Sequence, residues 1–396
     1  MTKLDRLLAE LCANGVEYKT IEEVVDLVMG VSPDGSTVSC EPLGIEFHQG
    51  KTFFGNMLLN PSGQYTSSPV KLAKADSIVM SVRAPVGDSN ITEREIAIGR
   101  GLCSMAGKAG LDTKFLYYWI NASIQIFKKK SNSATFESIN TNDIKAIQIP
   151  IPPLPIQREI IRVLDKFTEL TAELTAELTA RKKQYEYYRN ELLTFGDDVP
   201  MVSLGEVCAI GAGGTPQKGN IDYWKNGSIK WLGSTVCKNK KFVDDVIEHI
   251  TELGLKNSSA KILKCGTTLI AMVGATIGKV AFLNFEATTN QNVAALYPLD
   301  GSRLDESYLF YSCQKLFPQF AALSSGGKLA IANLSFIRGL QISLPPLAEQ
   351  KRVVSILDRF DALTNDITTG LPAEIIARQK QYEYYRDKLL TLIMKE

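Results

Sequence analysis

Several short motifs come close to patterns that bind phosphate or transfer methyl groups. A P-loop needs the pattern G-x-x-x-x-G-K-[ST], but residues 274–280, GATIGKV, are one residue short and lack the hydroxyl. An amino-methyltransferase needs Asn or Asp before a Pro-Pro-aromatic turn. The two Pro-Pro segments, IPPL at 151–154 and LPPL at 344–347, carry an aliphatic residue at that position. We therefore interpret them as hinges.

The sequence gives equally little support for metal binding or for thiol chemistry. The chain has two histidines, far apart in sequence, and seven cysteines without a C-x-x-C pair. An odd number of scattered cysteines in a long chain indicates reduced thiols and predicts a cytoplasmic protein. The first residues, MTKLDRLLAELCANG, lack a continuous apolar segment and predict a short amphipathic helix over residues 1–15.

The dominant feature of the sequence is an internal repeat. RKKQYEYYRNELLTF at 181–195 recurs as RQKQYEYYRDKLLTL at 378–392. Upstream, IPIPPLPIQREIIRVLDKFTEL at 149–170 aligns with ISLPPLAEQKRVVSILDRFDAL at 342–363. An internal repeat of this length indicates a duplicated structural unit. The chain is thus two halves, each a variable block followed by a hinge and a long helix.

The variable blocks are expected to share one α/β (α+β) plan of mixed sheet and helices. Short apolar runs such as 76–83 and 96–98 predict strands, and a helix is expected near 114–121, whose surroundings match 304–314. We predict four segments: a first domain at 1–149, a spacer helix at 150–198, a second domain at 199–341 and a distal helix at 342–396. The second domain is the basic one, with 14 Lys and Arg against 10 Asp and Glu.

The repeated segments predict long helices. Apolar residues recur every three or four positions after Pro155, which predicts one helix of about 40 residues, roughly 60 Å long. The second helix, from about 348 to 393, should break at Gly370-Leu371-Pro372. A one-faced helix needs a partner, so we predict an intramolecular antiparallel coiled coil with pseudo-two-fold symmetry. Parallel pairing with another chain is the alternative.

Inside the first helix lies TAELTAEL, at 171–178. Each tetrad is a good helix former with Leu on the paired face. A tetrad is also a unit of length, because four residues span about 6 Å of helix, close to two base pairs at roughly 3.4 Å each. Gaining or losing one would change both the length and the relative rotation of the helix ends.

This combination resembles the specificity subunits of type I restriction–modification systems, the HsdS family. The resemblance rests on the KQYEYYR runs, the PPL-x-x-Q segments, the TAEL tetrads and residues 211–232, GAGGTPQKGNIDYWKNGSIKWL. It covers the whole chain. The first block departs from it, since residues 28–33, VMGVSP, stand where Gly-Gly-Thr-Pro is expected.

The resemblance implies a DNA-binding subunit without chemistry of its own. Each variable block would be a target-recognition domain that reads one half of a bipartite site in double-stranded DNA. The paired helices would set the gap and dock two modification (adenine methyltransferase) subunits, and restriction subunits would join. No cofactor is expected in this chain; S-adenosylmethionine, ATP and Mg²⁺ would bind to the partner subunits.

Candidate DNA contacts are basic, amide or loop residues. Basic residues among aromatics suit phosphate contacts, and Asn and Gln can pair with base edges; each could equally be a solvated surface residue. In the first block the candidates are Lys51, Arg83, Arg94, Arg100, Lys128, Lys129 and Lys130. In the second they are Gly213, Gly214, Thr215, Lys218, Lys225, Lys230, Lys238, Lys240, Lys241, Asn290, Gln291 and Lys328.

The repeated aromatic runs are expected to lie in the helix pair or to dock partner subunits. The candidates for docking are Tyr185, Tyr188, Arg189, Tyr382, Tyr385 and Arg386. The net charge is only +1, which fits a subunit that binds DNA weakly alone and gains affinity from its partners. Two alternatives remain: a coiled-coil scaffold without sequence readout, and a nucleic-acid-modifying enzyme.

Overall fold

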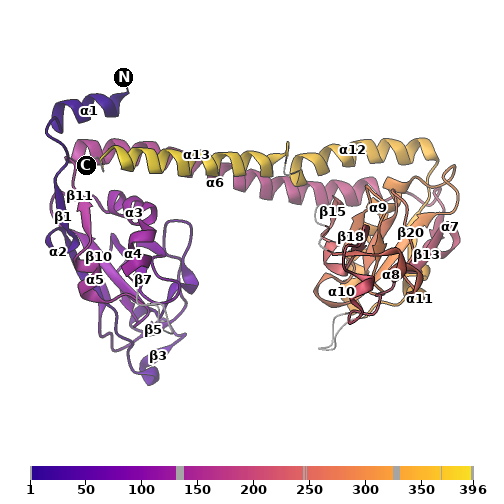
Figure 1. Cartoon of the computed structure of the whole chain (residues 1–396), viewed down its shortest axis with the longest axis horizontal. Coiled ribbons are helices and arrows are strands. Elements are labelled where there is room, and N and C mark those ends of the chain that lie inside the picture. The colour runs from indigo at the N-terminus through magenta and orange to yellow at the C-terminus, as the bar shows by residue number, and fades with distance from the viewer. Residues whose placement is uncertain are drawn as a thin grey trace. The chain divides into compact units, whose positions relative to one another are not determined.

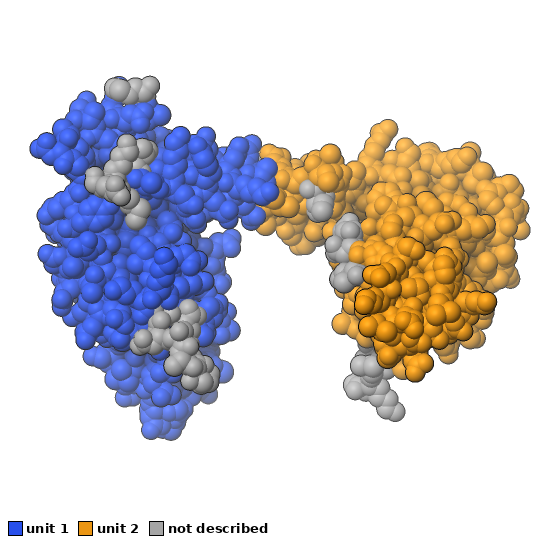
Figure 2. Space-filling model, in the orientation of Figure 1, with its two compact units in different colours: residues 1–172, 377–396 blue, residues 173–376 orange. Residues whose placement is uncertain are grey.

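A computed structural model describes residues 2–130, 138–243, 246, 248–323, 331–366 and 368–393. The chain forms two compact units (Figure 2). Unit 1 comprises Met1–Ala172 and Ala377–Glu396, and unit 2 comprises Glu173–Ile376. Two long helices, α6 (Leu154–Leu192) and α13 (Leu371–Leu392), contribute residues to both units.

Unit 1 holds a four-stranded antiparallel sheet in the order β2-β10-β7-β8 and a sheet in the order β3-β5-β4-β9-β6, in which β4 and β9 run parallel. Figure 1 labels β7 and β10 of the first sheet and β3 and β5 of the second. A short pair, β1-β11, lies next to the start of α6. The strands are β1 Tyr18–Thr20, β2 Val25–Met29, β3 Val38–Ser39, β4 Ile45–His48, β5 Tyr65–Thr66, β6 Leu72–Ala73, β7 Ser77–Ser81, β8 Ser89–Thr92, β9 Ile96–Ile98, β10 Leu102–Gly107 and β11 Gln148–Pro150. The helices are α1 Lys3–Leu11, α2 Ile21–Val24, α3 Thr113–Ala122, α4 Ile124–Lys130 and α5 Thr141–Lys145, with short 3₁₀ helices η1 Gly35–Thr37 and η2 Lys51–Phe53.

Unit 2 repeats this plan. Its main sheet has the order β13-β20-β17-β18-β15, and a smaller sheet, β16-β14-β19, again contains a parallel pair, β14 with β19. The strands are β12 Met201–Ser203, β13 Cys208–Ala212, β14 Ile229–Leu232, β15 Lys240–Phe242, β16 Glu248–Ile250, β17 Thr268–Ala271, β18 Val280–Phe282, β19 Thr288–Thr289, β20 Val293–Pro298 and β21 Gln341–Ser343. The helices are α7 Leu204–Val207, α8 Glu252–Lys256, α9 Glu306–Lys315, α10 Phe317–Leu323, α11 Leu334–Gly339 and α12 Leu347–Asn365, with η3 Ile221–Tyr223, η4 Ser234–Val236 and η5 Gly274–Thr276.

The core of each unit is built on a helix that is buried almost all round. In α3, residues 115–120 (FLYYWI) are buried, and in α9 residues 308–314 (YLFYSCQ) are buried. Each helix begins at an aspartate, Asp112 or Asp305, whose carboxylate accepts hydrogen bonds from first-turn N–H groups. The helices expected from the sequence at 114–121 and 304–314 are therefore confirmed.

The long helices also agree with the sequence pattern. Helix α6 is continuous over 39 residues. The second long segment is interrupted between Asn365 and Leu371, where Pro372 falls in the first turn of α13 and its missing N–H costs no helical bond. No described helix is long and apolar enough to cross a membrane.

Within each unit the long helices pair through stacked aromatic rings. In unit 1 the ring of Phe167 in α6 stacks on Tyr385 in α13, with ring centroids 5.2 Å apart. In unit 2 the ring of Tyr188 in α6 stacks on Phe360 in α12, at 5.8 Å. Unit 1 contains the start of α6 and the end of α13, and unit 2 contains the end of α6. The pairing is therefore antiparallel and lies within one chain.

A buried glutamine joins the body of each unit to the start of a long helix. Gln157 in α6 and Gln350 in α12 are both 0% exposed. Gln157 accepts from the N–H of Asp112 at 2.9 Å and donates to the carbonyl oxygens of Gly110 and Pro152, both at 2.8 Å. Gln350 makes the corresponding three bonds at the same lengths, to Asp305, Arg303 and Pro345.

We predict that Gln157→Met and Gln350→Met each lower the free energy of unfolding by about 2 kcal/mol. Methionine fills a similar volume but makes none of the three hydrogen bonds, and it leaves the carbonyl oxygen of Pro152 or Pro345 buried without a partner. Urea unfolding of the purified chain measures the effect. The matched control is Gln148→Met, an exposed position on β11, where we expect a change within about 0.5 kcal/mol. Equal effects at all three positions would contradict this role.

Candidate DNA interface

Three loops meet at the same edge of each unit, and we call this region the three-loop edge. In unit 1 it consists of residues 30–33 after β2, 49–51 after β4 and 99–101 after β9. Because β4 and β9 are parallel, the loops that follow them leave from the same side of the sheet. In unit 2 the equivalent loops are 213–216, 233–236 and 290–292.

A glycine brings the first loop against the third. A Cβ placed on Gly30 would lie 2.1 Å from the carbonyl oxygen of Gly99, and one on Gly213 would lie 1.9 Å from that of Thr289. The next residue in each loop bonds to the same strand end: the N–H of Val31 donates to Ile98 at 3.0 Å, and that of Gly214 donates to Thr289 at 2.8 Å. The close neighbour of these glycines is thus the chain's own backbone.

This geometry resolves the departure noted in the first block. Residues 30–33 (GVSP) occupy the same place as residues 213–216 (GGTP), with Ser32 at the position of Thr215 and a proline after each. The signal in the sequence was the spacing of glycine, hydroxyl and proline, which is the same in both segments. The sequence comparison missed it because Val31 replaces Gly214.

The hydroxyl residue of the first loop contacts a glutamine in both units. In unit 1, Ser32 Oγ donates to Gln49 Oε1 at 2.9 Å and accepts from the backbone N–H of Arg100 at 3.3 Å. In unit 2, Thr215 Oγ1 donates to Gln291 Oε1 at 2.6 Å. Both glutamines are exposed. Gln49 was not among the residues singled out from the sequence, since nothing local marks it.

Basic side chains gather around the three-loop edge of unit 1. Arg100 is exposed in the third loop. Arg83 is exposed one residue after Val82, whose N–H donates to Gly101 at 2.9 Å. Lys51 begins η2 and pairs with Asp88 at 2.5 Å. The structure therefore brings three of the predicted basic residues to one edge, where they could contact phosphates.

Arg94 has a different environment, because it pairs with Glu46 under the second loop. The carboxylate of Glu46 accepts from Arg94 Nε at 2.5 Å, from the N–H of Ser62 at 2.6 Å and lies 2.9 Å from His48 Nε2. Burial alone would raise the pKa of Glu46, but the bonds from Arg94, Ser62 and His48 lower it to about 2. This network joins Arg94 to Glu46 and His48 of β4, the strand directly before Gln49, so Arg94 has a structural partner within the chain.

In unit 2 the predicted mixture of lysines and tryptophans forms one packed cluster. Lys218 Nζ lies 4.1 Å from the ring centre of Trp224 and 4.7 Å from that of Trp231, and 2.8 Å from Glu248. Trp231 Nε1 donates to the carbonyl oxygen of Gly214 at 2.9 Å. The tryptophans therefore anchor the first loop while Lys218 remains exposed beside it.

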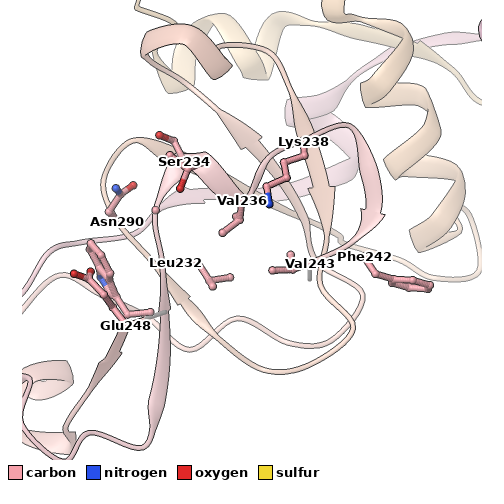
Figure 3. A pocket seen from close by; sticks show the side chains of 11 residues that line it. Leu232, Ser234, Val236, Lys238, Phe242, Val243, Glu248 and Asn290 are labelled. Carbon is pink, nitrogen blue, oxygen red and sulfur yellow. The ribbon is translucent and has the colours of Figure 1, made fainter. Parts of the chain in front are cut away.

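A cavity of about 560 Å³ opens next to the second and third loops of unit 2 (Figure 3). Its floor is apolar, from residues such as Leu232, Val236 and Val243, and its rim includes Lys238 and Asn290. Asn290 Oδ1 accepts from the N–H of Asn292 at 2.9 Å, which shapes the third loop. Such a hollow combines apolar contact with polar groups at its entrance.

The other predicted basic residues are more dispersed. Lys128, Lys129 and Lys130 form the exposed end of α4. Lys225, Lys230 and Lys240 are partly or fully exposed, and Lys230 Nζ lies 3.8 Å above the ring of Phe285. Lys241 is buried and bonded to Asp358 of α12. Lys328 lies outside the described residues.

The repeated tyrosine runs divide into an inner and an outer part. The hydroxyl of Tyr185 donates to Gln314 at 2.8 Å and the residue is buried; Tyr382 packs beside Tyr118 in the core of unit 1. Arg189 and Arg386 each lie over the ring of the inner tyrosine. The exposed part includes Tyr188 and Tyr385. It also includes two residues that the sequence analysis did not single out, Tyr187 and Tyr384, each 60% exposed.

No group of three or more His, Cys, Asp or Glu residues that could hold a metal ion occurs among the described residues. The side chains gathered at each three-loop edge are hydroxyl, amide and basic groups. Such groups bind by hydrogen bonding and charge.

We predict that Gly30→Ala and Gly213→Ala each lower the free energy of unfolding by about 1 to 3 kcal/mol, because the added methyl group would force the first loop away from a carbonyl oxygen. Urea unfolding measures the loss. Gly35→Ala and Gly211→Ala are matched controls, since an added Cβ there meets nothing within 4 Å. A loss at the controls as large as at Gly30 and Gly213 would show that the close approach is not the cause.

Comparison with known proteins identifies the fold and the family. The sequence profile described as "Type I restriction modification DNA specificity domain" matches residues 14–181 and again 196–377. The chain is 40% identical over 287 residues to the EcoR124I/EcoR124II type I restriction enzyme specificity subunit of Escherichia coli, covering 70% of each chain. It is 33% identical over 299 residues to a putative type I restriction enzyme specificity subunit of Haemophilus influenzae, covering 72% of this chain and 73% of that one.

Two solved structures share the fold across nearly the whole chain. One is the S subunit of a type I restriction–modification system from M. genitalium, with TM-score 0.55 and 16% identity over 95% of this chain and 96% of that one. The other comes from a study of complex assembly and conformational transition in a type I system, with TM-score 0.65 and 18% identity over 95% and 97%. From the two matches to the family profile and the identity to its members, the chain belongs to the type I restriction–modification specificity subunits, which are the non-catalytic DNA-recognition components of these systems.

Proposed function

We propose that each unit reads one half of a bipartite site in double-stranded DNA through its three-loop edge. The observation that carries this proposal is that both units build the same edge from different side chains. Unit 1 presents Gln49 and Arg100 there, and unit 2 presents Gln291 and Lys218. One scaffold with two sets of exposed polar groups suits the reading of two different half-sites.

In this proposal the basic residues position the subunit and the amides and loop groups specify the sequence. Phosphate contacts fix register without carrying sequence information, whereas contacts to base edges discriminate. Arg83, Arg100 and Lys51 would contact phosphates in unit 1, with Lys128–Lys130 extending the basic surface. In unit 2, Lys218, Lys225 and Lys238 would do so, and Lys230 and Lys240 would contribute at the margin.

The paired helices would set the gap between half-sites. The TAEL tetrads at 171–178 span the position where the chain passes from unit 1 to unit 2 within α6. Each tetrad adds about 6 Å of helix. The number of tetrads would therefore determine the distance between the two bound half-sites.

The experiment is a map of methylated adenines in DNA from cells that express this chain with a modification subunit, against cells without this chain. We expect a split motif that depends on the chain. Deleting residues 175–178 should change the gap by about two base pairs and leave both half-sites intact. Thr175→Ala keeps the helix length and should leave the gap unchanged.

Three outcomes would count against this function. A stable complex with an active methyltransferase that produces no chain-dependent motif would remove the recognition role and leave a scaffold. Deletion of the tetrad that alters a half-site, with the gap unchanged, would refute the spacing role of α6. Methylation or DNA cleavage by the purified chain alone would show an enzyme.

The outer tyrosines of the repeated runs would dock two modification subunits, one on each unit. Tyr187 packs edge-on against Tyr188, and Tyr384 against Tyr385, with ring centroids 5.4 and 5.3 Å apart. Exposed aromatic pairs are frequent centres of protein interfaces.

The cofactors S-adenosylmethionine, ATP and Mg²⁺ would bind to the partner subunits. Restriction subunits would complete the complex. The assembly would work in the cytoplasm.

We predict that combining Tyr187→Ala with Tyr384→Ala weakens binding of modification subunits at least about tenfold, the effect typical of removing a central aromatic contact. Calorimetric titration of the purified chain with modification subunit measures the Kd. The control combines Lys183→Ala with Lys380→Ala, exposed residues at equivalent positions of the repeat. Unchanged affinity in the tyrosine variant would place the docking surface elsewhere.

A further inference from the structure

Both units contain an exposed glutamine whose carbonyl oxygen is held by a hydroxyl of the first loop. The contact joins Ser32 to Gln49 at 2.9 Å and Thr215 to Gln291 at 2.6 Å. The two glutamines come from different loops, Gln49 from the loop after β4 and Gln291 from the loop after β19. Both units therefore contain the same hydroxyl–glutamine pair, although the two glutamines come from non-equivalent loops.

The contact has a chemical consequence for the amide. A glutamine amide has one acceptor oxygen and one donor nitrogen with two hydrogens. The hydroxyl donates to one of the two lone pairs of this oxygen and so orients the amide. Within the described part of the chain, Nε2 of Gln49 and Nε2 of Gln291 donate to no residue. The exposed end of each side chain is thus an oriented donor.

The first loops, whose residues hold Gln49 and Gln291, are themselves bonded to other loops or strands of the three-loop edge. Ser32 also accepts from the N–H of Arg100, so the second loop is tied to the third through one hydroxyl. Thr215 follows Gly214, whose carbonyl oxygen is held by Trp231. By contrast, Asn290 uses its Oδ1 to bond the N–H of Asn292 and serves the shape of its own loop. Gln291 is therefore the better placed of the two neighbouring amides.

We propose that Gln49 and Gln291 are specificity-determining residues, each donating from Nε2 to a hydrogen-bond acceptor on a base edge in its half-site. Ser32 and Thr215 are the positioning residues. In the major groove the acceptors are N7 and O6 of guanine, N7 of adenine and O4 of thymine. This inference rests on the proposed function, and assigns one base position in each half-site to one side chain.

The test is the methylation map repeated with Gln49→Met and Gln291→Met, which keep the length of the side chain and remove its donor. We expect Gln49→Met to relax the preference at one position of one half-site by roughly tenfold and to leave the other half-site unchanged. Gln291→Met should do the converse. Competition between duplexes that differ at that position, measured with the purified complex, gives the ratio directly.

The controls are Gln148→Met and Gln341→Met, equivalent exposed positions on β11 and β21, which should leave both half-sites unchanged. Ser32→Ala and Thr215→Val retain the glutamine but remove its anchor. They should relax the same base position as the corresponding glutamine variant, while Ser32→Thr and Thr215→Ser restore the preference. A structural role alone would instead lower binding to all duplexes equally.

The failure of this inference can be told apart from failure of the proposed function. If the parent chain yields a split motif and both glutamine variants yield the same motif with the same preferences, the glutamines do not read bases although the recognition role stands. If one variant relaxes positions in both half-sites, the assignment of one glutamine to one half-site is wrong. If the parent chain yields no motif, the function itself fails.

Discussion

The buried hydrogen bonds of Gln157 and Gln350 are the constraint on which the rest of each unit depends. Each glutamine satisfies one N–H and two carbonyl oxygens where the chain enters a long helix. An amide that is fully buried tolerates little displacement, because every lost bond leaves a polar group without a partner. The hydrogen bonds of this glutamine therefore join the helix to the rest of its unit.

A carboxylate about two turns further along each helix extends the same junction. Asp165 accepts from the hydroxyl of Tyr118 at 2.7 Å, and Asp358 accepts from Tyr311 at 2.5 Å. The tyrosines belong to α3 and α9, the buried helices of the two cores. The helix thus contacts the fold through its most buried element. The loops of the three-loop edge do not take part in these contacts with the long helices, so their residues can differ between the units.

The sequence predicted the parts that repeat and missed the parts that differ. The internal repeat was enough to place α6, α12, α13, α3 and α9, because the long helices have apolar periodicity and the two copies of each segment agree. The edge was harder to predict. Its strands β4, β9 and β19 are two to four residues long, too short for a period-two pattern, and their parallel pairing brings together loops that lie far apart in the sequence. Gln49 can be recognised as a candidate only from the structure, which places Ser32 and Arg100 next to it.

The inner and outer tyrosines show that the exposed face of a helix is also hard to predict from the sequence. A sequence run such as QYEYYR marks a helix face only if its rotation is known. Position 185 is buried while 187 and 188 are exposed, and the copy at 382, 384 and 385 follows the same order of burial. The first tyrosine of each run therefore packs into the core, and the two tyrosines that follow it are exposed. The same division occurs in both units. It follows that the helical surface is kept constant in both units, while the loop edge carries the differences.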